Sequence, residues 1–140
     1  MAFWDASAIV PVCCSQPATA QGRRLHRELK RIVVWWGTPL EVRSALARLV
    51  REGQLTPDDR SKAVDLLTKL RVAWDEILPS ERVRSLAEDM PDAHGLRAAD
   101  AAQLAAALVW CRERPRGRAF VCFDQRLRSA AAALGFSVRP

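Results

Sequence analysis

Short apolar runs alternate along the chain with longer segments in which apolar residues recur every three or four positions. The runs predict β-strands at residues 1–4, 31–36, 76–78, 119–123 and 136–139. The longer segments predict helices at residues 7–14, 17–30, 38–52, 57–74 and 80–90. Two further helices are predicted, one that begins within residues 96–100 and runs to about 111, and one that follows residue 124 and ends at 134. Residues 91–95 are predicted to form a turn. Strands that alternate with helices indicate a parallel sheet with right-handed crossovers. We therefore expect an α/β fold with the first run as its central strand.

One helix start carries a strong local signal. The stretch Thr38-Pro39-Leu40-Glu41 predicts Thr38 as the N-cap, Pro39 as the first helical residue and Glu41 as the partner that completes a capping box. Thr56 and Pro57 repeat the beginning of this signal at the next helix. The repeated signal indicates two helix starts and does not indicate that the chain is built from internal sequence repeats.

Composition bounds the class of protein and its partners. The 140 residues suffice for one domain with a hydrophobic core. A net charge of +6 makes a polyanionic partner plausible. Of the 22 basic residues 19 are arginine, which suits bidentate phosphate contacts but equally fits a bias in genomic composition.

Neither a membrane segment nor a zinc site is expected. No apolar stretch approaches the roughly 20 residues of a membrane helix, and the N-terminus lacks the early basic residue of a secretory leader. We therefore expect a cytoplasmic protein. The spacing of Cys13, Cys14, Cys111 and Cys122 does not match a zinc site and predicts buried, reduced thiols.

Four acids stand where strands end or helices begin, and each has a local explanation. Asp5 and Asp124 follow strands and can cap the helices after them. Glu41 can complete the capping box. Asp100 lies early in its helix, where the helix dipole favours a carboxylate.

Taken together, the same acids predict a metal site. Asp100 precedes Leu104, Leu108 and Cys111 by four, eight and eleven positions, so it heads the apolar stripe of its helix. Glu41 precedes Ala45 and Leu49 by four and eight positions, so it also lies on the apolar face of its helix. A carboxylate on a buried face is costly unless it is paired or bound to metal. Because neighbouring parallel strands end at one edge of a sheet, all four acids can meet there. Oxygen ligands without His or Cys suit Mg²⁺ or Mn²⁺.

Four stretches of the chain resemble a known family. They are DAS at residues 5–7, TPLE at 38–41, LRAADAAQLA at 96–105 and VCFD at 121–124. In order and spacing they are similar to the motifs of PIN-domain ribonucleases, and among these to VapC-type toxins of bacterial toxin–antitoxin pairs. The stretch at residues 96–105 is the most specific of these four for the family. The resemblance covers essentially the whole chain.

The resemblance implies a three-layer α/β/α PIN-like fold, with residues 1–140 as a single domain, and divalent-metal-dependent cleavage of RNA. It assigns the acidic metal pocket to Asp5, Glu41, Asp100 and Asp124. Ser7 would be the small polar residue beside that pocket. Cys122 departs from the pattern, because the family often has Thr or Ser there and a thiol is a poorer hydrogen-bond partner. The implied partners are a VapB-type antitoxin and a second copy in a homodimer.

The expected chemistry agrees with the acids. A divalent cation neutralises charge on a scissile phosphate and acidifies bound water. Without a catalytic histidine, hydrolysis should leave a 3′-hydroxyl and a 5′-phosphate. Arg97, Arg116, Arg118 and Arg126 lie near the acids in sequence and are candidate RNA contacts. Whether tRNA, rRNA or mRNA is cut, and with one metal or two, stays open.

Other classes fit less well. A catalytically inert PIN-like module that binds RNA or protein is the main alternative, although all four acids are present. A receiver domain would need paired acids after the first strand and a lysine near the last one. A haloacid-dehalogenase-type phosphatase would need a second Asp where Ser7 stands. A dinucleotide-binding domain would need a glycine-rich turn, which is absent.

Overall fold

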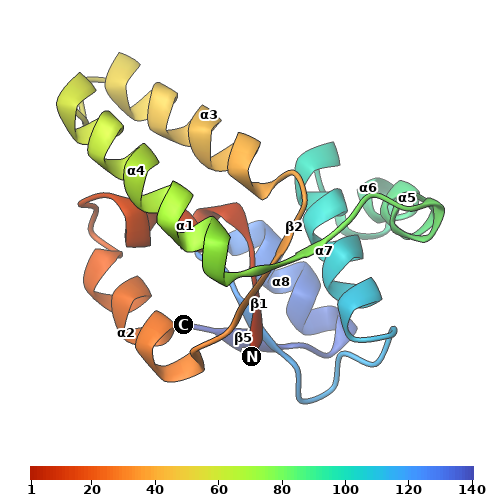
Figure 1. The fold of residues 1–140 in the computed structure, drawn as a ribbon. Coiled ribbons are helices and arrows are strands. Elements are labelled where there is room, and N and C mark those ends of the chain that lie inside the picture. Colours follow the sequence, from red (N-terminus) through yellow and green to blue (C-terminus); the bar gives the residue numbers. More distant parts are fainter.

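A five-stranded parallel sheet forms the centre of the computed structural model, which describes residues 1–140 (Figure 1). Its strands are β1 (Ala2–Trp4), β2 (Ile32–Trp35), β3 (Asp75–Ile77), β4 (Ala119–Val121) and β5 (Ser137–Arg139). They lie in the order β3-β2-β1-β4-β5, and every neighbouring pair is parallel. The prediction that the first apolar run is the central strand is confirmed. All three residues of β1 are fully buried, as expected of a strand covered on both faces.

Eight helices cover the two faces of the sheet, which makes the fold a three-layer α/β/α arrangement. They are α1 (Ala6–Cys13), α2 (Thr19–Leu29), α3 (Thr38–Arg51), α4 (Pro57–Ala73), α5 (Glu81–Glu88), α6 (Met90–His94), α7 (Ala98–Trp110) and α8 (Gln125–Leu134). Helices α3 and α4 form a long antiparallel hairpin on the side that α1 and α2 also cover (Figure 1). None of the eight is both long enough and apolar enough to cross a bilayer.

The hydrophobic core is divided in two by the sheet. Trp4 and Val34 face the core under α1 to α4, whereas Phe3, Val33 and Phe120 face the core under α5, α7 and α8. Alternate residues of a strand point to opposite faces, so each short strand contributes to both cores. The rings of Phe3 and Phe120 stack with their centroids 5.6 Å apart.

The register of the sheet decides where the functional residues fall. Trp4 of β1 pairs with Val121 of β4, so Asp5 and Cys122 follow at the same edge. The amide of Asp5 continues the ladder by donating to the carbonyl of Val121 at 3.2 Å. The carboxyl ends of β1 and β4 therefore stay aligned beyond the strands, at the edge where α/β sheets bind ligands.

The prediction for residues 91–95 is wrong. Residues 91–95, expected to be a turn, belong largely to α6, which begins with Met90 and Pro91 and ends before Gly95. Proline is well accommodated in the first turn of a helix, where its missing N–H has no partner to lose. Gly95 adopts a φ of 64°, in the left-handed region that ends helices. A helix this short shows no apolar periodicity.

The cysteines form no disulfide and all four are buried, as expected. Burial raises the pKa of the Cys13 thiol to about 12 and also raises the pKa of the Cys122 thiol. Neither thiol is therefore activated as a nucleophile.

Candidate metal centre

Asp5 is the deepest acid of the site. It directly follows β1, is 4% exposed and caps α1 through two contacts with Ser7. The amide of Ser7 donates to Oδ2 at 3.0 Å, and the Ser7 hydroxyl donates to Oδ1 at 2.8 Å. Burial nevertheless raises the pKa of Asp5 to about 6, and the charge of Asp100 contributes in the same direction. The predicted N-cap role is confirmed, but it does not offset the cost of burying this charge.

Ser7 joins the ends of two strands. Its hydroxyl donates to Asp5 and accepts from the amides of Phe123 at 2.9 Å and Asp124 at 3.2 Å. One donor and two acceptors are the full capacity of a hydroxyl, so the ends of β1 and β4 are locked together. The Cys122 thiol is 3.7 Å from the same oxygen and donates to the Asp124 carbonyl at 3.4 Å. The thiol therefore supports the loop after β4 only through long contacts.

Glu41 enters the site from the first turn of α3, without the capping box that the sequence predicts. The N-cap is Gly37, and Thr38 is already helical and fully buried. Glu41 Oε2 instead accepts a 2.7 Å hydrogen bond from Gln103 Nε2. Burial raises the pKa of Glu41 to about 7, and the charges of Asp5 and Asp100 add to the increase.

Gln103 is the site residue that the sequence analysis missed. It lies on α7, is 1% exposed and bonds both Thr38 and Glu41. Its neighbours on the buried face of α7 are Ala and Leu, as the list Ala101, Leu104, Ala105, Ala106, Ala107 and Leu108 shows. A single polar residue at an apolar position of an amphipathic helix is the signal that would have identified it.

Asp100 and Asp124 line the same cleft as Asp5 and Glu41. Asp100 is in the first turn of α7, and its pKa is raised by burial and by the charge of Asp124, while Arg97 and Arg126 act in the opposite direction. Asp124 is exposed and caps α8, because its Oδ1 accepts from the amide of Leu127 at 2.8 Å. The N-cap prediction for Asp124 is confirmed.

All four acids line one cleft of about 410 Å³, together with Ser7. A second cleft of about 800 Å³ shares Asp100 and Asp124 with the first and extends to His94, Arg97 and Arg126. The cleft that holds the four acids therefore borders a cleft with Arg97 and Arg126 on its walls. Such a junction suits a ligand that carries phosphates along a chain and presents one of them to the acids.

Two of the four candidate arginines do not reach this junction. Arg116 and Arg118 precede β4, whereas Asp124 follows it, so the strand separates them from the acids across the sheet. Arg118 lies over the ring of Trp110 at 5.9 Å. Arg97 and Arg126 are the two candidates that line the cleft beside the acids.

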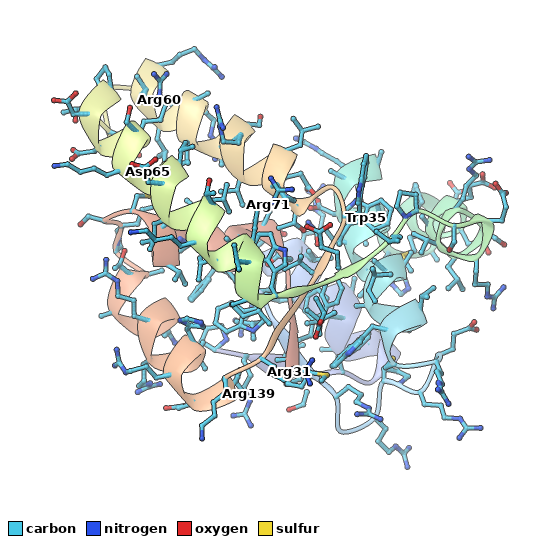
Figure 2. The ribbon with its side chains drawn as sticks, in the orientation of Figure 1. Arg31, Trp35, Arg60, Asp65, Arg71 and Arg139 are labelled. Atoms are coloured by element: carbon cyan, nitrogen blue, oxygen red, sulfur yellow. The ribbon has the colours of Figure 1, made fainter.

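The tryptophans at the end of β2 lie outside both clefts. Trp35 is half-buried beside the start of α7, where it lines an apolar groove with Ala98 and Ala101 (Figure 2). Trp36 is 55% exposed. Alternate strand residues face opposite sides of the sheet, and Trp35 packs against the core beneath α7.

The donor set fits a hard divalent cation. None of the four carboxylates forms a salt bridge, and three of them have a raised pKa. A cation would relieve both the burial and the mutual repulsion of these charges. The structure contains no group of three or more His, Cys, Asp or Glu side chains that lie close enough together to hold a metal ion directly. Because Mg²⁺ keeps several waters and needs only one or two direct carboxylates, this spacing is compatible with it.

Comparisons with known proteins do not assign the chain to a family. No family model matches it. No curated protein matches its sequence.

Proposed function

We propose that the protein is a divalent-metal-dependent endoribonuclease of the PIN-domain type. The observation that carries this proposal is the convergence of Asp5, Glu41, Asp100 and Asp124 on one cleft, where none of the four forms a salt bridge although Arg48 also lines the cleft. The adjoining cleft, with Arg97 and Arg126 on its walls, supports a polyanionic substrate. The net charge of +6 favours its approach.

Each residue has a distinct role in the proposed reaction. A cation bound by the acids, Mg²⁺ or Mn²⁺, supplies Lewis acidity toward the phosphate and acidifies water in the cleft. Asp5, held by Ser7 at the end of the central strand, is the fixed carboxylate of the site. Asp100 and Asp124 border both clefts, so the scissile phosphate binds beside them, and Arg97 and Arg126 hold flanking phosphates.

Cleavage assays test this proposal directly. The purified protein is incubated with a mixture of single-stranded RNAs in the presence of Mg²⁺, Mn²⁺ or EDTA. We expect cleavage with either cation, none with EDTA, and products with 5′-phosphate and 3′-hydroxyl ends. Cleavage in EDTA that leaves 2′,3′-cyclic phosphates would contradict the metal mechanism and would direct attention to His94 in the basic cleft. RNA binding without cleavage under any condition would support the inert module.

The biological role proposed is that of a toxin. The resemblance to VapC-type toxins supports it, and with it a VapB-type antitoxin that binds the protein and a homodimeric state. Expression of the protein alone should arrest bacterial growth, and coexpression of the neighbouring gene should relieve the arrest. An Asp100→Asn variant that arrests growth as strongly as the wild type would separate toxicity from RNA cleavage and contradict the proposed link.

A matched pair of arginine substitutions tests the path of the RNA. Arg97→Ala and Arg126→Ala should each raise KM and lower the slope of log affinity against log salt by about 0.7, the value for one phosphate contact with a single strand. Arg116→Ala and Arg118→Ala remove the same charge from the other side of β4 and serve as controls. The measurement is RNA affinity between low and physiological salt. Equal effects of all four substitutions would mean that only net charge matters.

A further inference from the structure

Gln103 has a hydrogen-bonding pattern that ties two helices to the acidic cleft. Its side-chain NH₂ group donates to Glu41 Oε2 at 2.7 Å and to Thr38 Oγ1 at 3.1 Å, so both of its hydrogens are used. Glu41 Oε1 makes no hydrogen bond within the protein and is left for the cleft, which Glu41 lines. The amide therefore fixes one oxygen of a carboxylate whose other oxygen is available to a ligand.

The orientation of the Gln103 amide follows from the carboxylate. An ionised Glu41 can only accept hydrogen bonds, so the nitrogen of the amide and not its oxygen must face it. The amide oxygen then faces the Thr38 hydroxyl, at 3.5 Å. Thr38 is fully buried and its hydroxyl contacts both the nitrogen and the oxygen of the amide, so Thr38 holds the amide group in place while the carboxylate decides which atom faces Glu41. The arrangement is that of an outer residue that orients a ligating carboxylate.

Packing alone does not account for an amide at this place. Every other buried residue of α7 is apolar, and an apolar side chain of similar volume would fill the same space. The amide is required by its partner, because without it the partly buried carboxylate of Glu41 would lose its hydrogen-bond donor. The polar side chain of Gln103 is therefore explained by Glu41 and not by the packing of α7.

We propose that Gln103 is a positioning residue, which together with Thr38 aims Glu41 into the cleft and thereby sets the affinity of the cleft for a divalent cation. This inference rests on the proposed function, because it requires the acids to bind metal. Gln103 itself touches neither metal nor RNA. Its effect passes through Glu41.

The test measures Mn²⁺ binding to the purified protein by calorimetry and by the electron paramagnetic resonance signal of free Mn²⁺, so no RNA is needed. Gln103→Met removes the amide at nearly unchanged volume and should weaken Mn²⁺ binding about tenfold, as outer-shell substitutions do. Gln16→Met is the matched control, because Gln16 lines the same cleft and its side chain bonds none of the acids. It should bind Mn²⁺ like the wild type.

A second pair keeps the test valid if Gln103→Met does not fold. Thr38→Val removes the hydroxyl at constant shape and should weaken Mn²⁺ binding severalfold, whereas Thr38→Ser keeps the hydroxyl and should restore most of the affinity. Wild-type affinity in folded Gln103→Met, or in Thr38→Val if Gln103→Met fails to fold, overturns the positioning role. If the wild type itself binds no Mn²⁺, the proposed function fails as well, and the two failures are thereby distinguished.

Discussion

Asp100→Asn is expected to reduce RNA cleavage at least a hundredfold while leaving the fold unchanged. Asp100 makes no hydrogen bond with another side chain, and its pKa is raised by burial and by the charge of Asp124. Asparagine has nearly the same shape, so the substitution removes a charge and little else. In the proposed mechanism that charge holds the cation where the acidic and basic clefts meet, and transition-state charge stabilisation at one such position accounts for about a hundredfold or more in rate.

The measurement is single-turnover cleavage of RNA at saturating Mg²⁺, combined with thermal unfolding of both proteins. Asp65→Asn is the matched control, because Asp65 lies on the exposed face of α4, away from both clefts (Figure 2). It should cleave at the wild-type rate. An Asp100→Asn variant that is folded and fully active would rule out the four-acid site. Partial recovery of the variant at high Mn²⁺ would instead indicate weakened metal binding.

Asp5→Asn is a less clean experiment for a structural reason. The Ser7 hydroxyl already accepts from two amides and donates its only hydrogen to Asp5. The oxygen of an asparagine can replace only one of the two carboxylate acceptors. The asparagine NH₂ group would then face either the Ser7 amide, which is itself a donor, or the Ser7 hydroxyl, whose two acceptor sites are already occupied. Loss of stability would then accompany the loss of charge.

The fold was largely predictable because the strands of a doubly covered sheet are short apolar runs with clear boundaries. The convergence of the acids followed from a topological rule, since the carboxyl ends of parallel strands lie at one edge. Asp5 and Asp124 illustrate that a local and a functional explanation are compatible. Each caps a helix and also lines the acidic cleft.

Two of the errors, the capping box and the placement of the arginines, share a cause: sequence distance was taken for spatial distance. Thr38 and Glu41 have the spacing of a capping box, yet Gln103, 62 positions after Glu41, provides the partner of both. Arg118 is only six positions before Asp124, but β4 lies between them. Arg118 therefore lies at the amino ends of the parallel strands and Asp124 at their carboxyl ends. Periodicity indicates which face of an element is buried, and only tertiary structure decides what it meets there.

Glu41→Gln is expected to stabilise the metal-free protein at pH 8 and to have little effect near pH 4. The pKa of Glu41 is about 7 in the folded protein, against 4.5 in a solvated chain. Below pH 4.5 both states are protonated, so the carboxyl costs nothing. As pH rises from 4.5 to 7, the unfolded state loses its proton first, and the folded state becomes progressively less stable by comparison. Above pH 7 the cost is complete, and removing the charge should recover about 2 kcal/mol after allowance for the partial exposure of Glu41.

The measurement is thermal unfolding of the wild type and the variant between pH 4 and pH 8, with and without Mg²⁺. A gain of this size corresponds to a rise in Tm of about 6 °C at pH 8 for a chain of this length. Mg²⁺ should reduce the difference in Tm between the two proteins. It stabilises the wild type by binding to its folded state, and it should bind the variant more weakly because the Gln side chain carries no charge. Glu88→Gln, an exposed acid on α5 without a salt bridge, should leave the Tm unchanged at every pH. A Glu41→Gln variant less stable than the wild type at pH 8 would show that the Gln103 hydrogen bond outweighs the burial of the charge, and that the acidic cleft carries no electrostatic cost for a cation to relieve.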